Sequence, residues 1–239
     1  MMAPPLLAIE NLSAGYNGLN VLAGLSLEVG AGEFIAVVGP NGHGKTTLLK
    51  TISGLLSASG GSIALAGLDL THRRADQIVA AGIVHVPQGD LLFPDMTVRE
   101  NLLMGAYLPD AAARAGTRLE EVFHLLPKLR ERQGQIASTL SGGERRMTGI
   151  GRGLMSGGRV LMLDEPSLGL APIVIDQIYE LIDRLKASGR TIVLVEENAV
   201  RVFDRADRVY LLDNGHFVWS GSGSELMQRP EVLRTYLGG

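Results

Sequence analysis

Short apolar runs recur along this chain and alternate with segments of helical periodicity. Phe34–Val38, Val160–Leu163 and Thr191–Val195 are apolar almost throughout, which is typical of parallel strands buried on both faces of a sheet. Between the last two runs the pattern predicts a helix from about Pro172 to Ser188, ending before Gly189, because apolar residues recur at helical spacing. These residues are Ile175, Ile178, Leu181, Ile182 and Leu185. The alternation predicts an α/β core.

Other segments predict a β-subdomain and a helical insertion. Strands are expected at Leu6–Leu12, Leu25–Val29, Ser62–Leu65 and Ile83–Val86. Arg208–Asp213 and His216–Gly221 predict a hairpin, because the Asn214-Gly215 pair between them is a strong turn signal. From about Asp95 to Leu140 helix-forming residues dominate. We therefore divide the chain into a core with an N-terminal antiparallel β-subdomain (residues 1–94 and 158–239) and an inserted α-helical subdomain (residues 95–157).

Composition limits the possible functions. The chain has 239 residues, 46% of them hydrophobic, which is enough for a substantial core, and a net charge of −3, which gives no general electrostatic reason to bind nucleic acid. The absence of cysteine excludes disulfides and thiolate chemistry. The first residues, Met1–Pro5, lack the basic start of a secretory signal, and no run reaches the roughly 18–20 apolar residues that cross a bilayer. We expect a soluble, intracellular protein that reaches a membrane only through a partner.

A phosphate-binding loop is the strongest chemical signal. The loop separates the Phe34–Val38 run from a helix that starts near Leu48 and ends at Gly54. Its residues match the pattern G-x-x-x-x-G-K-[ST]: Gly39, Pro40, Asn41, Gly42, His43, Gly44, Lys45, Thr46 and Thr47. The glycines let backbone N–H groups turn toward a phosphate, and the helix N-terminus favours an anion. Lys45 is expected to reach the β- and γ-phosphates, and the Thr46 hydroxyl to ligate Mg²⁺. The context argues against a merely flexible glycine turn and predicts a P-loop NTPase core that binds a nucleoside triphosphate.

A pair of acids follows a second buried run. Val160–Leu163 leads directly into Asp164 and Glu165, so the strand delivers two carboxylates at its C-terminal end. Asp164 is expected to hold Mg²⁺ through its water shell, and Glu165 to polarise the attacking water. Alone, such a pair could equally be a solvated strand end; beside a phosphate loop, the catalytic interpretation is favoured.

A third pattern, Leu140-Ser141-Gly142-Gly143-Glu144, opens a helix whose apolar face contains Met147, Ile150, Leu154 and Met155. Ser141 and the N–H groups of Gly142 and Gly143 can hold an anion, although an ordinary Ser cap with Glu144 in a capping box would explain the local sequence. With the phosphate loop and the acid pair, this pattern resembles the signature motif of the ATPase subunits of ABC transporters. In that family the signature contacts the γ-phosphate of ATP held by a second subunit. The resemblance therefore implies two chains that sandwich two ATP molecules head to tail.

The resemblance extends from Leu6 to the closing Tyr236-Leu237-Gly238-Gly239 and implies further roles. Tyr16 matches the aromatic residue that stacks on adenine. Gln88 matches the glutamine that reaches Mg²⁺ and the attacking water, which makes Thr46, Gln88 and Asp164 the expected metal site. The same glutamine loop links the core to the helical subdomain.

Several segments are similar to one of the two ATPases of branched-chain amino-acid importers: Asp164–Pro172, Met96–Asn101 with Met104-Gly105, Leu194–Glu196 with Asn198-Ala199, and the Tyr-Leu-Gly-Gly end. This implies partners: a second ATPase subunit (identical or a paralogue), transmembrane permeases and, indirectly, a solute-binding protein, with the chain peripheral on the inner face of the membrane. Importers of urea and short-chain amides have much the same ATPase, so the solute stays open. A soluble ABC ATPase acting on DNA or ribosomes is disfavoured, since long coiled-coil insertions and a second cassette are absent. A phosphate-loop kinase would not need the signature.

Two positions depart from the family pattern. Glu197 stands where members usually carry a histidine that hydrogen-bonds the γ-phosphate, and we include it with Glu165 and Gln88 among the catalytic candidates. An ionised carboxylate has no proton to donate, so Glu197 is expected either to turn away from ATP or to be protonated. His43 occupies a variable position of the phosphate loop and is expected to act as a spacer.

The signature helix raises two further expectations. Its glycines at positions 149, 151 and 153 are each unfavourable by roughly 1 kcal/mol relative to alanine, which close backbone packing would explain. Arg145-Arg146 in this helix, like Arg73-Arg74 earlier in the chain, is expected to lie on a solvated face.

Overall fold

The computed structural model describes residues 4–89, 91–197 and 199–229. Met1–Ala3, Asn198 and the Tyr236–Gly239 run, on which parts of the sequence analysis rest, lie outside the described residues.

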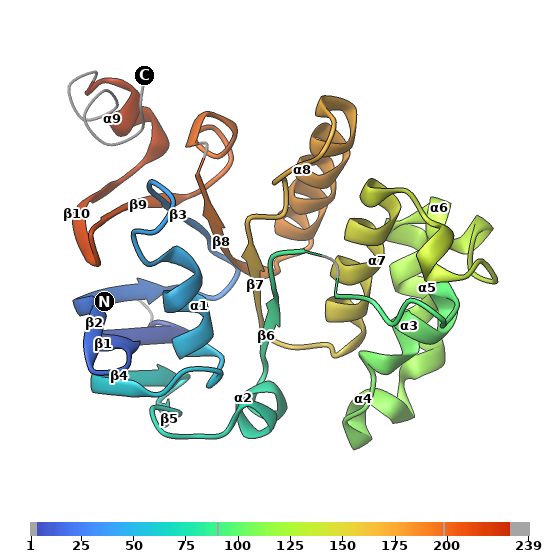
Figure 1. Cartoon of the computed structure of the whole chain (residues 1–239), viewed down its shortest axis with the longest axis horizontal. Coiled ribbons are helices and arrows are strands. Elements are labelled where there is room, and N and C mark those ends of the chain that lie inside the picture. Colours follow the sequence, from blue (N-terminus) through green and yellow to red (C-terminus); the bar gives the residue numbers. More distant parts are fainter. Residues whose placement is uncertain (1–3, 90, 198, 230–239) are drawn as a thin grey trace.

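The centre of the molecule is a six-stranded sheet in the order β10-β9-β3-β8-β7-β6 (Figure 1). Its strands are β3 (Phe34–Val38), β6 (Ile83–Val86), β7 (Val160–Asp164), β8 (Thr191–Glu196), β9 (Arg208–Asp213) and β10 (His216–Gly221). Neighbouring strands from β9 to β6 are parallel, and β10 pairs antiparallel with β9 through the predicted Asn214-Gly215 turn. Because the strands are parallel, the loops after β3, β6, β7 and β8 emerge at one edge, where the site forms.

A second, four-stranded antiparallel sheet has the order β2-β1-β4-β5. It contains β1 (Leu7–Tyr16), β2 (Leu19–Val29), β4 (Ala58–Leu65) and β5 (Leu68–Asp69). β1 and β2 are longer than predicted and meet in a tight hairpin at Asn17-Gly18, where both residues have positive φ (51° and 79°). The sequence pattern missed this hairpin because register shifts between Ile9 and Leu12 interrupt the alternation of apolar and polar positions.

The helices are α1 (Lys45–Ile52), α2 (Ala75–Ala81), α3 (Val98–Met104), α4 (Pro109–Ala113), α5 (Ala115–Leu125), α6 (Pro127–Glu131), α7 (Gly142–Met155), α8 (Pro172–Ala187) and α9 (Gly223–Met227), with short 3₁₀ turns at Ala137–Thr139 and Ala199–Arg201. In Figure 1 the helices α3 to α7 lie together on the side of the molecule away from the antiparallel sheet. α1 begins at Lys45, earlier than predicted, because the phosphate loop itself forms its N-terminus.

Two apolar clusters hold these layers together. Alternate residues of the central strands face opposite sides: Ile35 and Val37 pack with α1 and the antiparallel sheet, whereas Phe34 and Ala36 belong to the cluster that includes α8 and the α3–α7 helices. A Cβ on Gly151 would lie 2.8 Å from Leu102 and one on Gly153 only 2.6 Å from Val86, so the expected close packing of the signature helix is confirmed at these glycines.

The predicted fold class, an α/β P-loop NTPase core with an antiparallel β-subdomain and an α-helical insertion, is confirmed. The boundaries at residues 95 and 157 stay a prediction. Within the described residues, the structure contains no helix long and apolar enough to span a membrane.

Candidate active site

The phosphate loop lies between β3 and α1, and its glycines are required by close contacts. A Cβ on Gly39 would lie 2.1 Å from the carbonyl oxygen of Leu212, and one on Gly44 2.7 Å from Leu22. Gly42 and Gly44 also adopt positive φ (82° and 109°), which side-chain-bearing residues rarely do. The loop is therefore shaped by its own glycines and by the strands that it touches.

Lys45 is buried at the start of α1. Its ammonium group donates to the carbonyl oxygens of Gly39 (2.8 Å) and Pro40 (3.1 Å) and lies 3.1 Å from Oε1 of Glu165. These contacts hold the positive charge inside the loop, where a phosphate would have to compete with Glu165 for it.

Asp164 and Thr46 form the oxygen pair expected of a Mg²⁺ site. The Thr46 hydroxyl donates to Asp164 Oδ1 (3.1 Å), while Asp164 Oδ2 is buried and has no hydrogen-bond partner among the described residues. Burial raises the pKa of Asp164, and the Thr46 hydroxyl opposes that shift. No cluster of three or more His, Cys, Asp or Glu side chains suited to a metal occurs in the described parts of the chain. The residues fit Mg²⁺, which is usually held by one or two protein oxygens together with water and substrate phosphates.

Glu165 and Gln88 come from different loops and meet at this edge of the sheet. Gln88 Nε2, after β6, donates to Glu165 Oε2 (3.0 Å), and the Glu165 backbone N–H donates to Val195 O (3.0 Å). Glu165 has a φ of 43°, uncommon for a residue with a side chain, which is the kind of local strain found at functional sites. Both side chains line a cavity of about 230 Å³ with Asn41, Gly42, Gly44, Lys45, Thr46 and Thr47.

Two further predicted residues lie at the rim of the phosphate loop. Glu197 accepts a hydrogen bond from Asn41 Nδ2 (2.9 Å), so its carboxylate is directed at the loop. The His43 ring lies 2.8 Å from Asp213, the last residue of β9, and the backbone N–H of Gly215, in the turn to β10, donates to His43 O (3.1 Å). The side chain of His43 is therefore engaged with the hairpin, as suits a spacer.

Tyr16 lies at the end of β1 and is 43% exposed. Its neighbour in the hairpin, β2, runs beside the phosphate loop, where Val21 and Leu22 contact the position that a Cβ on Gly44 would occupy. Because the Tyr16 ring is exposed, it is available for stacking on a base, a role that stays a prediction.

The signature segment lies apart from this cavity. Ser141 caps α7, Glu144 completes the capping box, and Gly143 packs so closely on α8 that a Cβ there would lie 2.6 Å from Val174. Ser141, Gly143 and Glu144 line a different cavity, of about 420 Å³, among α6, α7 and α8. The structure therefore gathers the phosphate loop, Gln88 and the acid pair, but places the signature elsewhere.

Comparison with known proteins decides the family. A model described as ABC transporter matches residues 22–168, which include the phosphate loop, the signature and the acid pair. The chain belongs to the ABC transporter family. It is 43% identical over 234 residues to the high-affinity branched-chain amino acid transport ATP-binding protein BraG of Pseudomonas aeruginosa, across 98% of this chain and 100% of that protein.

Two other ABC transporter proteins extend the comparison. The lipopolysaccharide export system ATP-binding protein LptB of Escherichia coli is 33% identical over 242 residues, with 97% of each chain covered. The crystal structure of an ABC transporter's ATP-binding cassette in its ADP conformation matches with a TM-score of 0.87 at 29% identity, covering 99% of this chain and 100% of that one. The resemblance predicted from the sequence is confirmed: this chain is a nucleotide-binding, ATP-hydrolysing subunit of an ABC transporter.

One expectation about this ABC ATPase is wrong. Arg146 does not lie on a solvated face: its side chain is buried and donates to the carbonyl oxygen of Gly89 (2.8 Å), beside Gln88. The helical period could have indicated this, because Arg146 precedes Ile150 by four residues on the buried face of α7. The hydrogen bond to a carbonyl offsets part of the cost of burying the guanidinium. Arg73 and Arg74 are exposed, as predicted.

His85 is a further buried residue that the sequence did not single out. Its Nδ1 lies 3.1 Å from Ser53 Oγ, at the end of α1, and its Nε2 lies 4.0 Å from Asp164 Oδ2. Burial, and to a lesser degree Lys50, lowers the pKa of His85 to about 4, so the ring is neutral at pH 7. The ring therefore lies beside the Asp164 carboxylate without adding charge.

Proposed function

We propose that this chain energises an importer of branched-chain amino acids, paired with a second ATPase subunit beneath permeases on the inner face of the membrane. The observation that carries the proposal is its 43% identity to BraG along almost the entire chain, against 33% to LptB of an export system. Import of urea or short-chain amides remains the alternative, since this subunit does not hold the transported molecule.

The cavity at the phosphate loop supports the following use of ATP. Lys45 leaves Glu165 and pairs with the phosphates, whose other contacts are the loop's backbone N–H groups. Thr46 and Asp164 would hold Mg²⁺, which neutralises phosphate charge when it is bound. Glu165, released from Lys45 but still hydrogen-bonded to Gln88, polarises a water for attack on the γ-phosphate.

The separation of the signature from this cavity supports a two-subunit site. Ser141 and the first turn of α7 form an anion-binding helix end that the chain's own phosphate loop does not face. A second subunit, arranged head to tail, would bring its nucleotide to this end and receive the same contact in return. Both anion-binding elements are then used.

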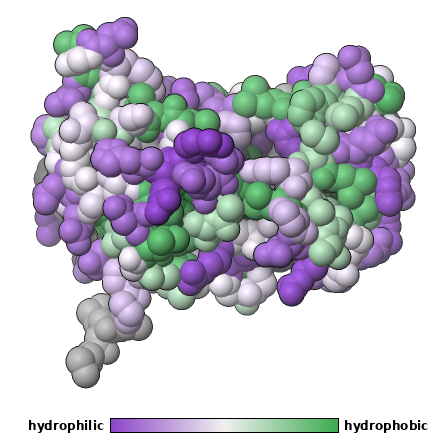
Figure 2. All heavy atoms as spheres, turned by 90° about the horizontal axis from the view of Figure 1, so that it is seen from below, coloured by the Kyte–Doolittle hydropathy of each residue, from purple (hydrophilic) through white to green (hydrophobic). Residues whose placement is uncertain are grey.

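An apolar groove near Gln88 supports contact with a permease. It has a volume of about 360 Å³, and its exposed apolar members are Leu91, Phe93, Met104 and Tyr107. Figure 2 shows that hydrophobic residues on the face seen from below lie in separate patches among hydrophilic ones. A contiguous apolar groove suits docking of a partner protein, and Pro87 in its lining places this groove directly beside the Gln88 loop.

Solute uptake tests the transport role. Cells that lack this chain should lose most high-affinity uptake of radiolabelled leucine, isoleucine and valine, and regain it with the wild-type chain but not with Lys45→Ala. Loss of urea or acetamide uptake instead would select the alternative importer. Unchanged uptake of all these solutes, with no permease recovered when the chain is pulled down from membranes, would indicate a non-transport ATPase.

Dimer formation tests the two-subunit site. In a Glu165→Gln background, which slows hydrolysis, ATP should convert the monomer to a dimer in size-exclusion chromatography. Ser141→Arg should abolish that dimer while leaving monomeric ATP binding intact, because it places bulk and charge where the partner's phosphate docks. A dimer that survives Ser141→Arg rules out the sandwich.

A further inference from the structure

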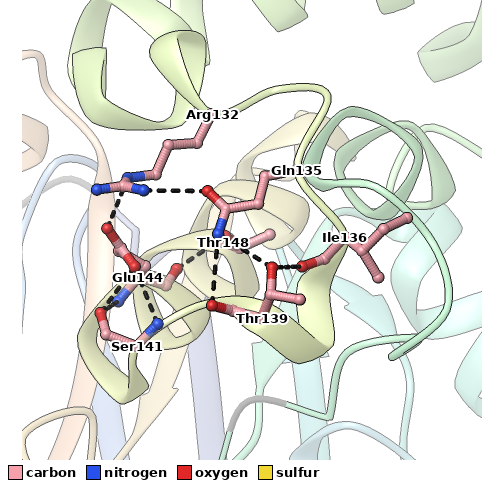
Figure 3. Close-up of polar contacts among 7 residues, drawn as sticks. All are labelled: Arg132, Gln135, Ile136, Thr139, Ser141, Glu144 and Thr148. Carbon is pink, nitrogen blue, oxygen red and sulfur yellow. Dashed lines mark hydrogen bonds and ion pairs between the residues drawn. The ribbon is translucent and has the colours of Figure 1, made fainter.

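A chain of polar contacts surrounds the signature (Figure 3). Arg132, directly after α6, lies with its Nε 2.7 Å from Glu144 Oε1 and donates through Nη1 to Gln135 Oε1 (3.0 Å). Gln135 Nε2 in turn donates to Thr139 Oγ1 (3.0 Å), just before the signature. On its other oxygen, Oε2, Glu144 accepts from the backbone N–H (2.9 Å) and the hydroxyl (2.8 Å) of Ser141.

Glu144 creates an electrostatic problem for an anion site. Although burial opposes ionisation, hydrogen bonds from Ser141 and the charges of Arg132 and Lys128 lower the pKa of Glu144, so it is a carboxylate at pH 7. A full negative charge thus lies in the first turn of α7, next to the place where a phosphate would dock. Arg132 provides a compensating positive charge in direct contact with it.

The Ser141 hydroxyl must also change partner. It has one proton, which is directed to Glu144 Oε2, and a phosphate would need the same proton. When the hydroxyl turns away, Glu144 keeps the Ser141 backbone N–H and Arg132 as donors. Without Arg132, the partly buried Glu144 carboxylate would keep only the Ser141 backbone N–H of these two donors. Moving the Ser141 hydroxyl from Glu144 to the phosphate would then cost more free energy.

We propose that Arg132 is a positioning residue for the ATP of the second subunit: through Glu144 it holds the signature in place, offsets the carboxylate's charge and allows Ser141 to donate to the γ-phosphate. Gln135 fixes the guanidinium from the opposite side. This inference rests on the two-subunit site proposed above, and it assigns Arg132 no contact with nucleotide.

The test measures ATP-driven dimerisation in the Glu165→Gln background. Arg132→Gln should weaken the dimer by about 3- to 30-fold, less than the roughly 10- to 150-fold of a fully buried hydrogen bond to a charged group, and leave monomeric ATP affinity and the melting temperature unchanged. Arg132 is 44% exposed and Glu144 19%, so the loss should shrink between about 0.05 M and 0.5 M salt. Arg132→Lys should recover part of it. Arg130→Gln is the matched control: Arg130 lies two residues before Arg132, and its substitution removes only an exposed ion pair with Glu120.

A double-mutant cycle separates positioning from direct contact. In a Glu144→Gln background, Arg132→Gln should have little further effect, since the charge through which Arg132 acts is gone. An equal loss in both backgrounds, or an unweakened dimer in Arg132→Gln, overturns the inference. If the dimer survives Ser141→Arg, the two-subunit site itself is wrong. If Ser141→Arg abolishes the dimer but Arg132→Gln does not weaken it, only the role of Arg132 is refuted.

Discussion

The contact between Glu165 and Lys45 predicts an effect of Glu165→Gln on affinity as well as on turnover. The carboxylate is buried and divided between Lys45 (3.1 Å) and Gln88 (3.0 Å). ATP needs the same ammonium group, so binding must break this ion pair and bring phosphate charge close to Glu165. Glutamine preserves the shape and can still accept from Gln88, but it carries no charge.

The magnitude follows from the geometry. A phosphate oxygen in contact with Lys45 lies within about 6 Å of the Glu165 carboxylate, where like charges repel by about 3 kcal/mol per unit charge at an effective dielectric near 20. Mg²⁺ and the backbone N–H groups offset much of this repulsion, so we expect a net gain of about 1–2 kcal/mol, or roughly 5- to 30-fold tighter ATP binding. Turnover should fall by about 10²–10⁴-fold, because the group that polarises water is lost.

Fluorescent nucleotide titration below the concentration that supports dimers measures the affinity, and steady-state phosphate release measures the turnover. The gain should be larger for ATP than for ADP, which lacks the γ-phosphate. Glu165→Asp, which retains the charge, is the control and should show no gain. Unchanged or weaker ATP binding by Glu165→Gln refutes the competition for Lys45, and near-normal turnover removes Glu165 from the chemistry.

Three other substitutions test separate features. Glu197→Gln removes a carboxylate that contacts Asn41 at the phosphate loop, and should raise ATPase activity or lower the apparent KM near pH 7.5; kinetics identical to wild type at pH 7.5 and 6 would place the side chain outside the site. Gly153→Ala should lower the free energy of unfolding, measured in urea, by about 1–3 kcal/mol, because the added Cβ would meet Val86. Gly116→Ala, where the added Cβ would have open space, should raise that free energy by up to about 1 kcal/mol, and equal effects of the two substitutions would refute the packing argument. Burial raises the pKa of Glu196 above its ordinary 4.5, so the native state binds more protons at this side chain than the unfolded chain does, and wild-type stability should fall as the pH rises above 4.5. Glu196→Gln should reduce this fall in stability, and parallel curves of stability against pH for the two proteins would contradict the assignment.

The burial of Arg146 shows why the environment of a side chain is harder to predict than a helix or strand. Strands β3, β6, β9 and β10 begin and end where the apolar pattern placed them, since a buried parallel strand or an Asn-Gly hairpin is encoded within a few adjacent residues. Arg146 follows the same helical period as Ile150, but its partner, the Gly89 carbonyl, lies 57 residues away. Two adjacent arginines predict a solvent-exposed face unless the distant acceptor that one of them binds is known.

The sequence alone determined the chemistry of each contiguous motif: the phosphate loop, the Asp164-Glu165 pair and the signature, because glycine geometry, strand polarity and helix capping act over a few residues. The tertiary structure decided which motifs meet. It brought Gln88 and Glu165 together around Lys45, kept the signature apart from them, and paired Arg132 with Glu144. These contacts depend on the order β10-β9-β3-β8-β7-β6 and on how α7 packs against α8, and such long-range pairings are fixed by burial of the whole core rather than by any local pattern.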